Sequence, residues 1–589
     1  MPLPEPRPHR PRWRLAASLV LSAVLVGAGA TGTAGAEPDR EPIKVMVVGD
    51  SMSHGAEGDW TWRYRLWEWF RGEDVAVDFV GPYTGTQDAA VAAPPAVPPL
   101  QGEQPPPPGP PRTSGAYAAG TEPFDSDHFA VWGRQAAQDK SLIREQVALH
   151  QPDYLLVGLG FNDLGWFVSG PEGTLDSMRT LVEQARAAKP DIRFALANVP
   201  QRTRMDGRED LPRNTDAYNG MLAAAIPSWS TPASPVALVD WRGNYACELD
   251  GCPDGYDGLH PNATGEYKIA QAFERTLHDS YGLGSSVPAL PGTIPARPTP
   301  VPADVVAAAS PGGVTVTWDA VFGAYGYTVR SRLKGATAWA ESRAAANRHD
   351  TTWTVDGQEW EYQVRTENGD QVRSDWSPVV SAVAHPETAR GPEDIVTRAT
   401  ATGVDVEWTE PTGEHTSTID RYQIITLDKD TPGAWIGGTA VKGTSAHLDG
   451  LVPGHRYSVA VATWNAAGGG IPAGARPVTV GAGTPPPPTD LQVTSTDATT
   501  VRLAWTGSSG AAGYRVWVRN TTGGGPSTVD GGVVEGTSHG VAYLFPGTWN
   551  YEFCVTAVNG AAESERSRCV VAPRPESRGH VPVTGSKVG

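Results

Sequence analysis

Two patterns of hydrophobic and polar positions divide the chain. In residues 37–281, apolar runs suited to buried parallel strands alternate with helical patterns; the runs are KVMVVG, VAVDFVG, DYLLVGLG, RFALANV and VALVDW. The segment TWRYRLWEWF has the spacing of an amphipathic helix whose apolar, core-facing stripe holds Trp62, Leu66, Trp69 and Phe70. Alternating strands and helices predict a three-layer α/β domain with a parallel sheet, which binds ligands beyond the carboxyl ends of its strands.

Short alternating strands replace this pattern in the second half of the chain, and they recur three times. The first strand pattern of each repeat ends in a tryptophan: VTVTW at Trp318, VDVEW at Trp408 and VRLAW at Trp505. A later strand of each repeat carries a tyrosine, in EYQVRT, RYSVAVAT and NYEFCVTA. Repeats of this length with one tryptophan and a late tyrosine predict three all-β sandwiches.

The proline-rich segments and the change of pattern predict the domain boundaries. The expected parts are a leader (1–36), the α/β domain (37–284), a stiff linker (285–304), three sandwiches (305–386, 387–482 and 485–573) and a flexible tail (574–589). Residues 86–120 contain ten prolines and predict an extended, mobile excursion from the α/β domain, more simply a solvated loop than an active-site lid. The sandwiches are expected to be spacers or binding modules.

The amino terminus and the net charge restrict location and partners. Arginines precede the apolar stretch LAASLVLSAVLVGAGA, and Ala34-Gly35-Ala36 has the form of a cleavage site, so we expect a secretory signal and an extracellular protein. An uncleaved membrane anchor is the alternative; no later segment is long and apolar enough to span a bilayer. The net charge of −18 argues against nucleic acid and anionic membranes as partners, and we expect a monomer.

The four cysteines form two local pairs. Cys247 and Cys252 enclose a turn-like segment, and Cys554 and Cys569 flank a longer one. Because an exported protein meets an oxidising environment, we expect the disulfides Cys247–Cys252 and Cys554–Cys569. Neither pair has the spacing of a zinc site, and no metal is expected.

One serine and one histidine are candidates for nucleophilic catalysis. Ser51 follows the first apolar run in GDSM, which by itself indicates only a turn after a strand. A hydrolytic serine needs a histidine as base and a group that orients it. The segment DGYDGLHPN offers Asp257 and His260 at a spacing that lets the carboxylate fold back onto the imidazole; a turn aspartate with a surface histidine is the alternative.

A third motif supplies a donor for an oxyanion. The apolar run LLVGLG is followed by Phe161, Asn162 and Asp163, so the Asn162 amide lies at the carboxyl end of a predicted strand. Removing such a donor from a hydrolase typically costs ~10²–10³ in rate. The alternative is a turn asparagine, with Asp163 as a helix cap.

In this order, GDSM (Gly49–Met52), GFND (Gly160–Asp163) and DGLH (Asp257–His260) resemble the GDSL/SGNH hydrolase family, and the likeness covers residues 41–281. The resemblance implies that Ser51 is the nucleophile, His260 the general base and then acid, and Asp257 its orienting partner. It further implies an oxyanion hole made by Asn162 and the backbone N–H groups of Ser51 and Gly133.

Gly133, in HFAVWGRQA, departs from the glycine motif often seen in that family, and we expect it just before a helix whose amino terminus faces the anion. We expect His54 to be structural or at the rim, and we assign no role to His128. Trp166 and Phe167 are predicted either to line the substrate site or to pack their own loop. The sandwiches resemble fibronectin type III domains, and SDWSP fits the last strand of that family.

Taken together, these features predict a secreted serine esterase that needs no metal or organic cofactor. Expected substrates are acyl groups on extracellular polysaccharide, because sandwich modules on a stiff linker suit work on insoluble polymers. Lipids or small aliphatic esters are the alternative, as is a non-enzymatic surface-binding protein that uses the hydrolase fold as a scaffold.

Overall fold

The computed structural model describes residues 41–369, 372–434, 436–495, 499–542, 544 and 550–571. The expected leader and tail lie outside these residues. The described chain contains one α/β domain with its own buried core and three β-sandwiches, each with a separate core.

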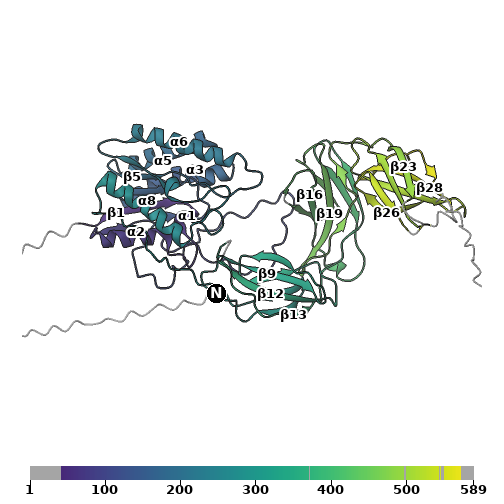
Figure 1. The fold of residues 1–589 in the computed structure, drawn as a ribbon, viewed down its shortest axis with the longest axis horizontal. Helices are drawn as coiled ribbons and strands as arrows, with labels where there is room; N and C mark the ends of the chain where they lie inside the picture. The colour runs from purple at the N-terminus through teal and green to yellow at the C-terminus, as the bar shows by residue number, and fades with distance from the viewer. Residues whose placement is uncertain are drawn as a thin grey trace, which may run out of the picture. The chain divides into compact units, whose positions relative to one another are not determined.

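A six-stranded sheet forms the centre of the α/β domain (Figure 1). Its main order is β2-β1-β4-β5-β6, β3 pairs with the end of β1, and all pairs are parallel. The strands are β1 (Ile43–Gly49), β2 (Val77–Phe79), β3 (Phe129–Ala130), β4 (Tyr154–Gly158), β5 (Arg193–Ala197) and β6 (Val236–Val239). Strands β1 and β4 are covered on both faces, which explains their nearly continuous apolar sequences. The five predicted strands are confirmed; the two-residue strand β3 was not foreseen.

Helices cover both faces of this sheet and complete three layers. Helix α2 packs against α8, and α5 packs against both α3 and α6. The helices are α1 (Ser51–His54), α2 (Thr61–Gly72), α3 (Ala136–His150), α4 (Phe161–Gly165), α5 (Pro171–Ala188), α6 (Leu211–Trp229), α7 (Trp241–Asn244) and α8 (Ala263–Tyr281). The aromatic stripe of α2 is buried in the domain core, as its spacing predicts.

The strand ends bring the three sequence motifs to one edge of the sheet. Gly49, at the end of β1, pairs with Gly158, at the end of β4, so the segments that follow these strands start side by side. The first leads into Ser51 and the second into Asn162. The segment with His260 follows β6 and α7 and precedes α8. This arrangement is the expected one for ligand sites in parallel sheets.

The proline-rich insertion 86–120 is tied to the domain at both ends. Thr86 and Gly115 exchange two backbone hydrogen bonds of 2.9 Å, and the N–H of Gln87 donates to the carbonyl of Gly55 at 2.9 Å. Most side chains between these anchors are exposed, in keeping with a segment that has no core of its own. Its mobility stays a prediction.

The linker 285–304, which was expected to be stiff, is bonded to the α/β domain through Ser286 and Arg297. Glu73, which directly follows α2, accepts a hydrogen bond of 2.8 Å from the Ser286 hydroxyl, and Arg297 forms an ion pair of 2.6 Å with Asp59. Both side chains of this ion pair are buried. A run of prolines limits internal freedom, but it does not prevent specific docking of the residues between the prolines.

The first sandwich consists of two sheets, β11-β8-β7 and β10-β9-β12-β13. The second and third sandwiches repeat this plan, with β14-β15-β18 and β23-β24-β27 as the smaller sheets. The larger sheets are built on β17-β16-β19-β20 and β26-β25-β28-β29, to which β21, β22 and β30 add short pairings. The tryptophans Trp318, Trp408 and Trp505 are buried in the three cores. The predicted fold class is therefore confirmed.

The strand bounds are as follows. In the first sandwich they are β7 (Val306–Ser310), β8 (Gly313–Thr317), β9 (Gly326–Leu333), β10 (Ala340–Ala344), β11 (Arg348–Thr351), β12 (Glu359–Glu367) and β13 (Val380–Val383). In the second they are β14 (Glu393–Ala399), β15 (Val404–Thr409), β16 (Arg421–Asp428), β17 (Gly437–Val441), β18 (Ser445–Leu448), β19 (Arg456–Asn465), β20 (Gly468–Gly469), β21 (Ala473–Gly474) and β22 (Val478–Thr479). In the third they are β23 (Thr489–Ser495), β24 (Val501–Thr506), β25 (Gly513–Asn520), β26 (Thr528–Val534), β27 (Ser538–Val541), β28 (Tyr551–Asn559), β29 (Ala562–Glu563) and β30 (Val570–Val571).

Both expected disulfides are formed, Cys247–Cys252 in the α/β domain and Cys554–Cys569 in the third sandwich. Within the described ranges, no helix combines the length and apolar character that crossing a membrane requires.

Candidate active site

The nucleophile candidate Ser51 is the first residue of the one-turn helix α1. Asp50 caps this helix by accepting a hydrogen bond of 3.0 Å from the N–H of Met52. Gly49 is required before the cap, because a Cβ at this position would overlap the Ser53 side chain. The sequence Gly-Asp-Ser therefore encodes a tight turn from strand into helix, as its composition indicates, and the turn presents Ser51 at the sheet edge.

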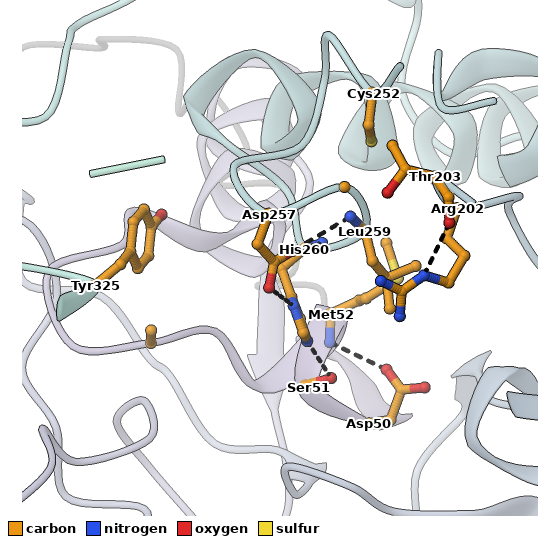
Figure 2. Close-up of polar contacts among 12 residues, drawn as sticks. Asp50, Ser51, Met52, Arg202, Thr203, Cys252, Asp257, Leu259, His260 and Tyr325 are labelled. Atoms are coloured by element: carbon orange, nitrogen blue, oxygen red, sulfur yellow. Dashed lines mark hydrogen bonds and ion pairs between the residues drawn. The ribbon is translucent and has the colours of Figure 1, made fainter. Parts of the chain in front are cut away.

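His260 lies between Ser51 and Asp257 and contacts both (Figure 2). Its Nε2 is 2.8 Å from Ser51 Oγ, and its Nδ1 is 2.8 Å from Asp257 Oδ2. The other carboxylate oxygen, Oδ1, accepts the backbone N–H of His260 at 2.9 Å. The three-residue spacing thus folds the aspartate back onto its own histidine, as the sequence predicts.

The charge state of Asp257 defines the roles of the two imidazole nitrogens. Burial would raise the pKa of Asp257, but hydrogen bonds and charge from His260, with the N–H of Leu259, outweigh burial and hold that pKa below its ordinary value. An ionised carboxylate only accepts hydrogen bonds, so Nδ1 carries a proton and donates it. In the neutral ring, Nε2 then accepts the Ser51 hydroxyl proton, which is the arrangement that a general base needs.

Two aromatic rings lie nearly parallel to the His260 imidazole. The Trp132 ring centroid is 4.7 Å away with an interplanar angle of 19°, and that of Tyr256 is 5.6 Å away at 21°. Sequence reasoning missed both residues, since neither belongs to a motif. Adjacency to Asp257 was the one available signal for Tyr256. The rings restrict the imidazole to the orientation in which it meets Ser51.

The disulfide hairpin contacts the histidine loop directly. Cys247 Sγ lies 3.2 Å from the carbonyl oxygen of Gly258, and that oxygen also accepts the N–H of Thr203 at 3.0 Å. Gly258 has φ +81°, and a Cβ there would overlap the Thr203 hydroxyl, so glycine is required in DGLH. The short disulfide therefore supports the loop that carries Asp257 and His260.

Asn162 of α4 lies beside the residues that precede α3. Its Nδ2 donates to the carbonyl of Arg134 at 3.0 Å and lies 3.4 Å from Asp50 Oδ2. Its Oδ1 accepts a hydrogen bond of 2.8 Å from the indole Nε1 of Trp166. The glycine before α4, Gly160, has φ +122° and allows the abrupt change of direction from β4 into this helix.

Asp163, the next residue, caps helix α3 instead of its own helix. Its carboxylate accepts the N–H groups of Ala136 and Ala137 at 2.8 and 2.9 Å. Burial raises the pKa of Asp163, and these two N–H groups partly offset the effect. Asp163 is therefore a helix cap, the alternative given in the sequence analysis, but it caps a helix that begins 27 residues earlier in the chain.

Gly133 lies before helix α3, as expected, and its role as an oxyanion donor stays a prediction. Helix α3 begins at Ala136, three residues after Gly133, and its first N–H groups are occupied by Asp163. The helix terminus therefore has no free N–H groups at these two positions to offer an anion. Gly133 has φ +77°, a backbone conformation that favours glycine. Two residues earlier, the N–H of Val131 donates to the carbonyl of Gly49 at 3.0 Å, which anchors this segment beside the nucleophile turn.

Two buried carboxylates lie close to this assembly. Burial raises the pKa of Asp50 to about 7, against the opposing effects of the Met52 N–H and His260. Burial likewise raises the pKa of Asp139 to about 7, although Arg134 forms a 2.7 Å ion pair with it. Perturbed carboxylates of this kind cluster at functional sites.

The two further histidines are buried structural groups. Burial, aided by the charge of Arg63, lowers the pKa of His54 to about 3, so its ring is neutral. His54 Nδ1 accepts the backbone N–H of Trp132 at 3.2 Å. Burial also lowers the pKa of His128, whose Nδ1 accepts the N–H of Ala130 at 3.0 Å. Neither ring is available to solvent.

Exposed apolar side chains lie around the Asn162 segment. Trp166 and Phe167 are 56% and 74% exposed, and an open groove of about 590 Å³ is lined by Trp132, Gly133 and Leu142 among others. These features are compatible with contact to a substrate. Among the described residues, the one trio spaced for a metal is Glu552, Cys554 and Cys569, and its two sulfurs form the disulfide.

Comparison with known proteins identifies the domains. Residues 47–267 match the GDSL-like lipase/acylhydrolase family, and residues 391–480 and 486–572 match the fibronectin type III domain. One similar solved structure is a carbohydrate esterase family 3 from Talaromyces cellulolyticus, at 23% identity over 41% of this chain and 100% of that chain, with a TM-score of 0.30. Another is a Clostridium thermocellum family 3 carbohydrate esterase, at 21% identity over 42% and 100%, with a TM-score of 0.29.

A third similar structure is that of the chicken CNTN1 FN1-FN3 domains, at 14% identity over 45% of this chain and 97% of that chain, with a TM-score of 0.16. The family matches agree with the motifs in the α/β domain and with the tryptophan repeats of the second and third sandwiches. Residues 47–267 therefore match the GDSL-like lipase/acylhydrolase family as one domain of the chain, and two matches to the fibronectin type III domain follow it.

Proposed function

We propose that this protein is a serine esterase, in which Ser51 is the nucleophile, His260 the general base and then acid, and Asp257 its orienting partner. The observation that carries the proposal is the continuous chain of contacts from Ser51 Oγ through His260 to Asp257, with both steps at 2.8 Å. The match of residues 47–267 to an acylhydrolase family supports the reaction class, since acylhydrolases cleave acyl groups with water.

The proposed reaction has two halves. His260 Nε2 takes the Ser51 proton while Oγ attacks the ester carbonyl, and the oxyanion is stabilised by Asn162 and the backbone N–H groups of Ser51 and Gly133. His260 then gives the proton to the departing alcohol, which leaves an acyl-serine. Water, deprotonated by the same imidazole, attacks the acyl group and releases the acid and Ser51.

For the substrate, we favour acyl groups on an extracellular polysaccharide. An open groove beside the site suits a small acyl group on a large polymer, and the two disulfides are compatible with an extracellular location. Lipids or small aliphatic esters are the second candidate, favoured by the exposed apolar side chains of Trp166, Phe167 and Val168.

The test compares two serine variants of the same helix. Ser51→Ala should lower turnover of p-nitrophenyl acetate by ~10³-fold or more, because the covalent route is lost. Ser53→Ala is the matched control: Ser53 is buried two residues away, and its hydroxyl has no hydrogen-bond partner, so kcat should stay within about twofold.

Ester turnover that survives in Ser51→Ala would contradict the mechanism. A panel of p-nitrophenyl esters of increasing chain length, run beside acetylated xylan, separates the two substrate classes. Preference for acetyl groups and release of acetate from xylan support the polysaccharide, whereas rising rates with chain length favour lipid.

A further inference from the structure

Trp166 lies one helical turn beyond Asn162, and its indole N–H contacts the Asn162 side chain. We propose that Trp166 is a positioning residue, which holds the Asn162 amide with its NH₂ group turned toward the oxyanion. This inference rests on the proposed function, because it assigns Trp166 a role through the Asn162 donor.

The hydrogen bond determines which way the amide faces. An indole N–H only donates, so the atom 2.8 Å from Trp166 Nε1 must be the Asn162 oxygen. The opposite rotamer would place the NH₂ group against another donor. With Oδ1 held, Nδ2 is directed toward the Arg134 carbonyl and Asp50, on the side where the nucleophile turn begins.

The two amide hydrogens of Asn162 make hydrogen bonds of unequal length. One donates to the Arg134 carbonyl at 3.0 Å, while Asp50 Oδ2 lies at 3.4 Å, near the limit for a hydrogen bond. The hydrogen on the Asp50 side is therefore the one that an oxyanion can recruit at small cost. Without the indole, rotation of the amide would lose this directed donor in part of the population.

The turn that carries Trp166 is itself fixed by contacts. Arg208 is buried, donates to the carbonyls of Leu164 (2.8 Å) and Gly165, and lies 3.9 Å over the Phe167 ring. Phe167 adopts φ +58°, a left-handed conformation that a non-glycine residue keeps only when its surroundings hold it. The indole thus stands on a rigid turn, although Trp166 is more than half exposed.

A substrate wall is the competing role for Trp166, and the two roles differ in kinetics. A wall contributes binding that is similar in ground and transition states, so its loss raises KM. A positioning residue acts in the transition state through Asn162, so its loss lowers kcat. Acetyl substrates, which reach little beyond the site, make the distinction sharper.

The experiment is a double-mutant cycle on p-nitrophenyl acetate. Trp166→Phe keeps an aromatic ring and removes the N–H; we expect kcat about tenfold lower with KM within about twofold, the size expected for one lost hydrogen bond. In an Asn162→Ala background the same substitution should change kcat less than about twofold, because its target is gone. Trp353→Phe, at a comparably exposed tryptophan of the first sandwich, should leave kcat unchanged.

Equal losses in the two backgrounds, or a rise in KM at constant kcat, would overturn the inference. Replacing Trp166 with 3-benzothienylalanine, which has sulfur in place of the N–H in a ring of similar shape, separates a lost hydrogen bond from lost packing. The full loss of kcat should recur with this residue; near wild-type kcat would refute the role of the N–H. If the proposed function itself is wrong, Ser51→Ala will keep its activity, and this result separates that failure from a failure of the Trp166 role.

Discussion

The α/β domain and the sandwiches bury different kinds of polar groups. The α/β core contains charged or titratable side chains, among them Asp50, His54, Arg63, Asp163 and Glu266. Within the described parts of the three sandwiches, the buried polar side chains are those of threonine, serine and asparagine. Uncharged groups need only one or two partners, whereas a buried charge carries a much larger desolvation cost.

This difference in buried polar groups separates the domain that contains the candidate site from the domains that do not. In the α/β domain, the costly groups hold other parts of the site, as Asp163 does for α3 and Arg208 for the Trp166 turn. In the second sandwich, Thr463 Oγ1 simply donates to the carbonyl of Ala389 at 2.6 Å. Sandwich cores of this kind serve folding alone, so any binding function of these domains has to come from their surfaces.

Truncation of the chain is expected to have the largest effect on this comparison. If chemistry resides in the α/β domain, a protein of residues 37–303 should hydrolyse a soluble small ester with kcat/KM within about twofold of the full chain. Ending at residue 284 should instead lower Tm by about 5 °C or more and reduce the active fraction, because Asp59 then loses its buried partner Arg297.

Circular dichroism and ester kinetics on the two truncated proteins provide the check. Equal stability of both would show that the docked linker contributes nothing. A 37–303 protein that is folded but inactive on the soluble ester would break the comparison itself, since a sandwich would then be needed for catalysis. Loss of rate on insoluble polymer alone would indicate that the sandwiches bind it.

The two disulfides offer a matched pair for the next test. Replacing Cys247 and Cys252 by serine should lower kcat severalfold with little change in Tm, because the closed loop is short and its bond supports the Gly258 carbonyl. Replacing Cys554 and Cys569 should leave kcat unchanged and destabilise the third sandwich by up to about 3 kcal/mol, as the longer loop predicts.

Kinetics and calorimetry of both double variants decide the matter. Free thiols at these positions in the unreduced protein would contradict the assignment from the start. If the Cys247 and Cys252 variant instead loses Tm and keeps kcat, the hairpin is a stability element and does not position the histidine loop.

The smallest expected effect concerns pH. Burial raises the pKa of Glu274 from 4.5 to about 8, so the folded domain keeps this carboxyl protonated where the unfolded chain has lost the proton. Stability therefore falls as the pH rises from about 4.5 to 8. Glu274→Gln should raise the Tm of the α/β domain by roughly 2–4 °C at pH 8 and by almost nothing near pH 4.5.

Glu563 of the third sandwich is the control with the opposite sign. Burial would raise its pKa, but hydrogen bonds from Thr556 and Arg515 outweigh burial and lower it. Its contribution is therefore present at neutral pH and is lost as the pH falls through the lowered pKa. Glu563→Gln should destabilise the sandwich at pH 7 and less at low pH; the same pH trend in both variants would refute this reading.

Sequence predicted much of this molecule because its strongest signals are local. Apolar runs marked the central strands, the repeated tryptophans marked the sandwich cores, and the spacing of Asp257 and His260 indicated their contact. Strand β3 escaped because two residues are too few to show a period. The ion pair of Arg297 with Asp59 escaped because it joins residues far apart in the chain, and nothing near either residue indicates the other.

The Trp166 contact lies between these extremes. Asn162 and Trp166 are four residues apart, so a predicted helix at this point would have placed them on one face. Sequence analysis placed Asn162 at the end of a strand, with a turn as the alternative, and did not predict helix α4, which is only five residues long. Sequence analysis offered Asp163 as a helix cap, but nothing in the sequence indicated that the capped helix is α3, because its partners there are backbone groups.

Because Asp163 binds backbone N–H groups, its contact is hard to recognise when related sequences are compared. Asp163 holds the amides of residues 136 and 137, which every residue type except proline offers, so this contact places no requirement on the side chains at those two positions. A contact of this kind leaves no paired changes in an alignment. In a mutational scan, substitutions of Asp163 would therefore reduce activity as substitutions of a catalytic residue do. A coevolution map would show no pairing between Asp163 and its true partner, the start of α3.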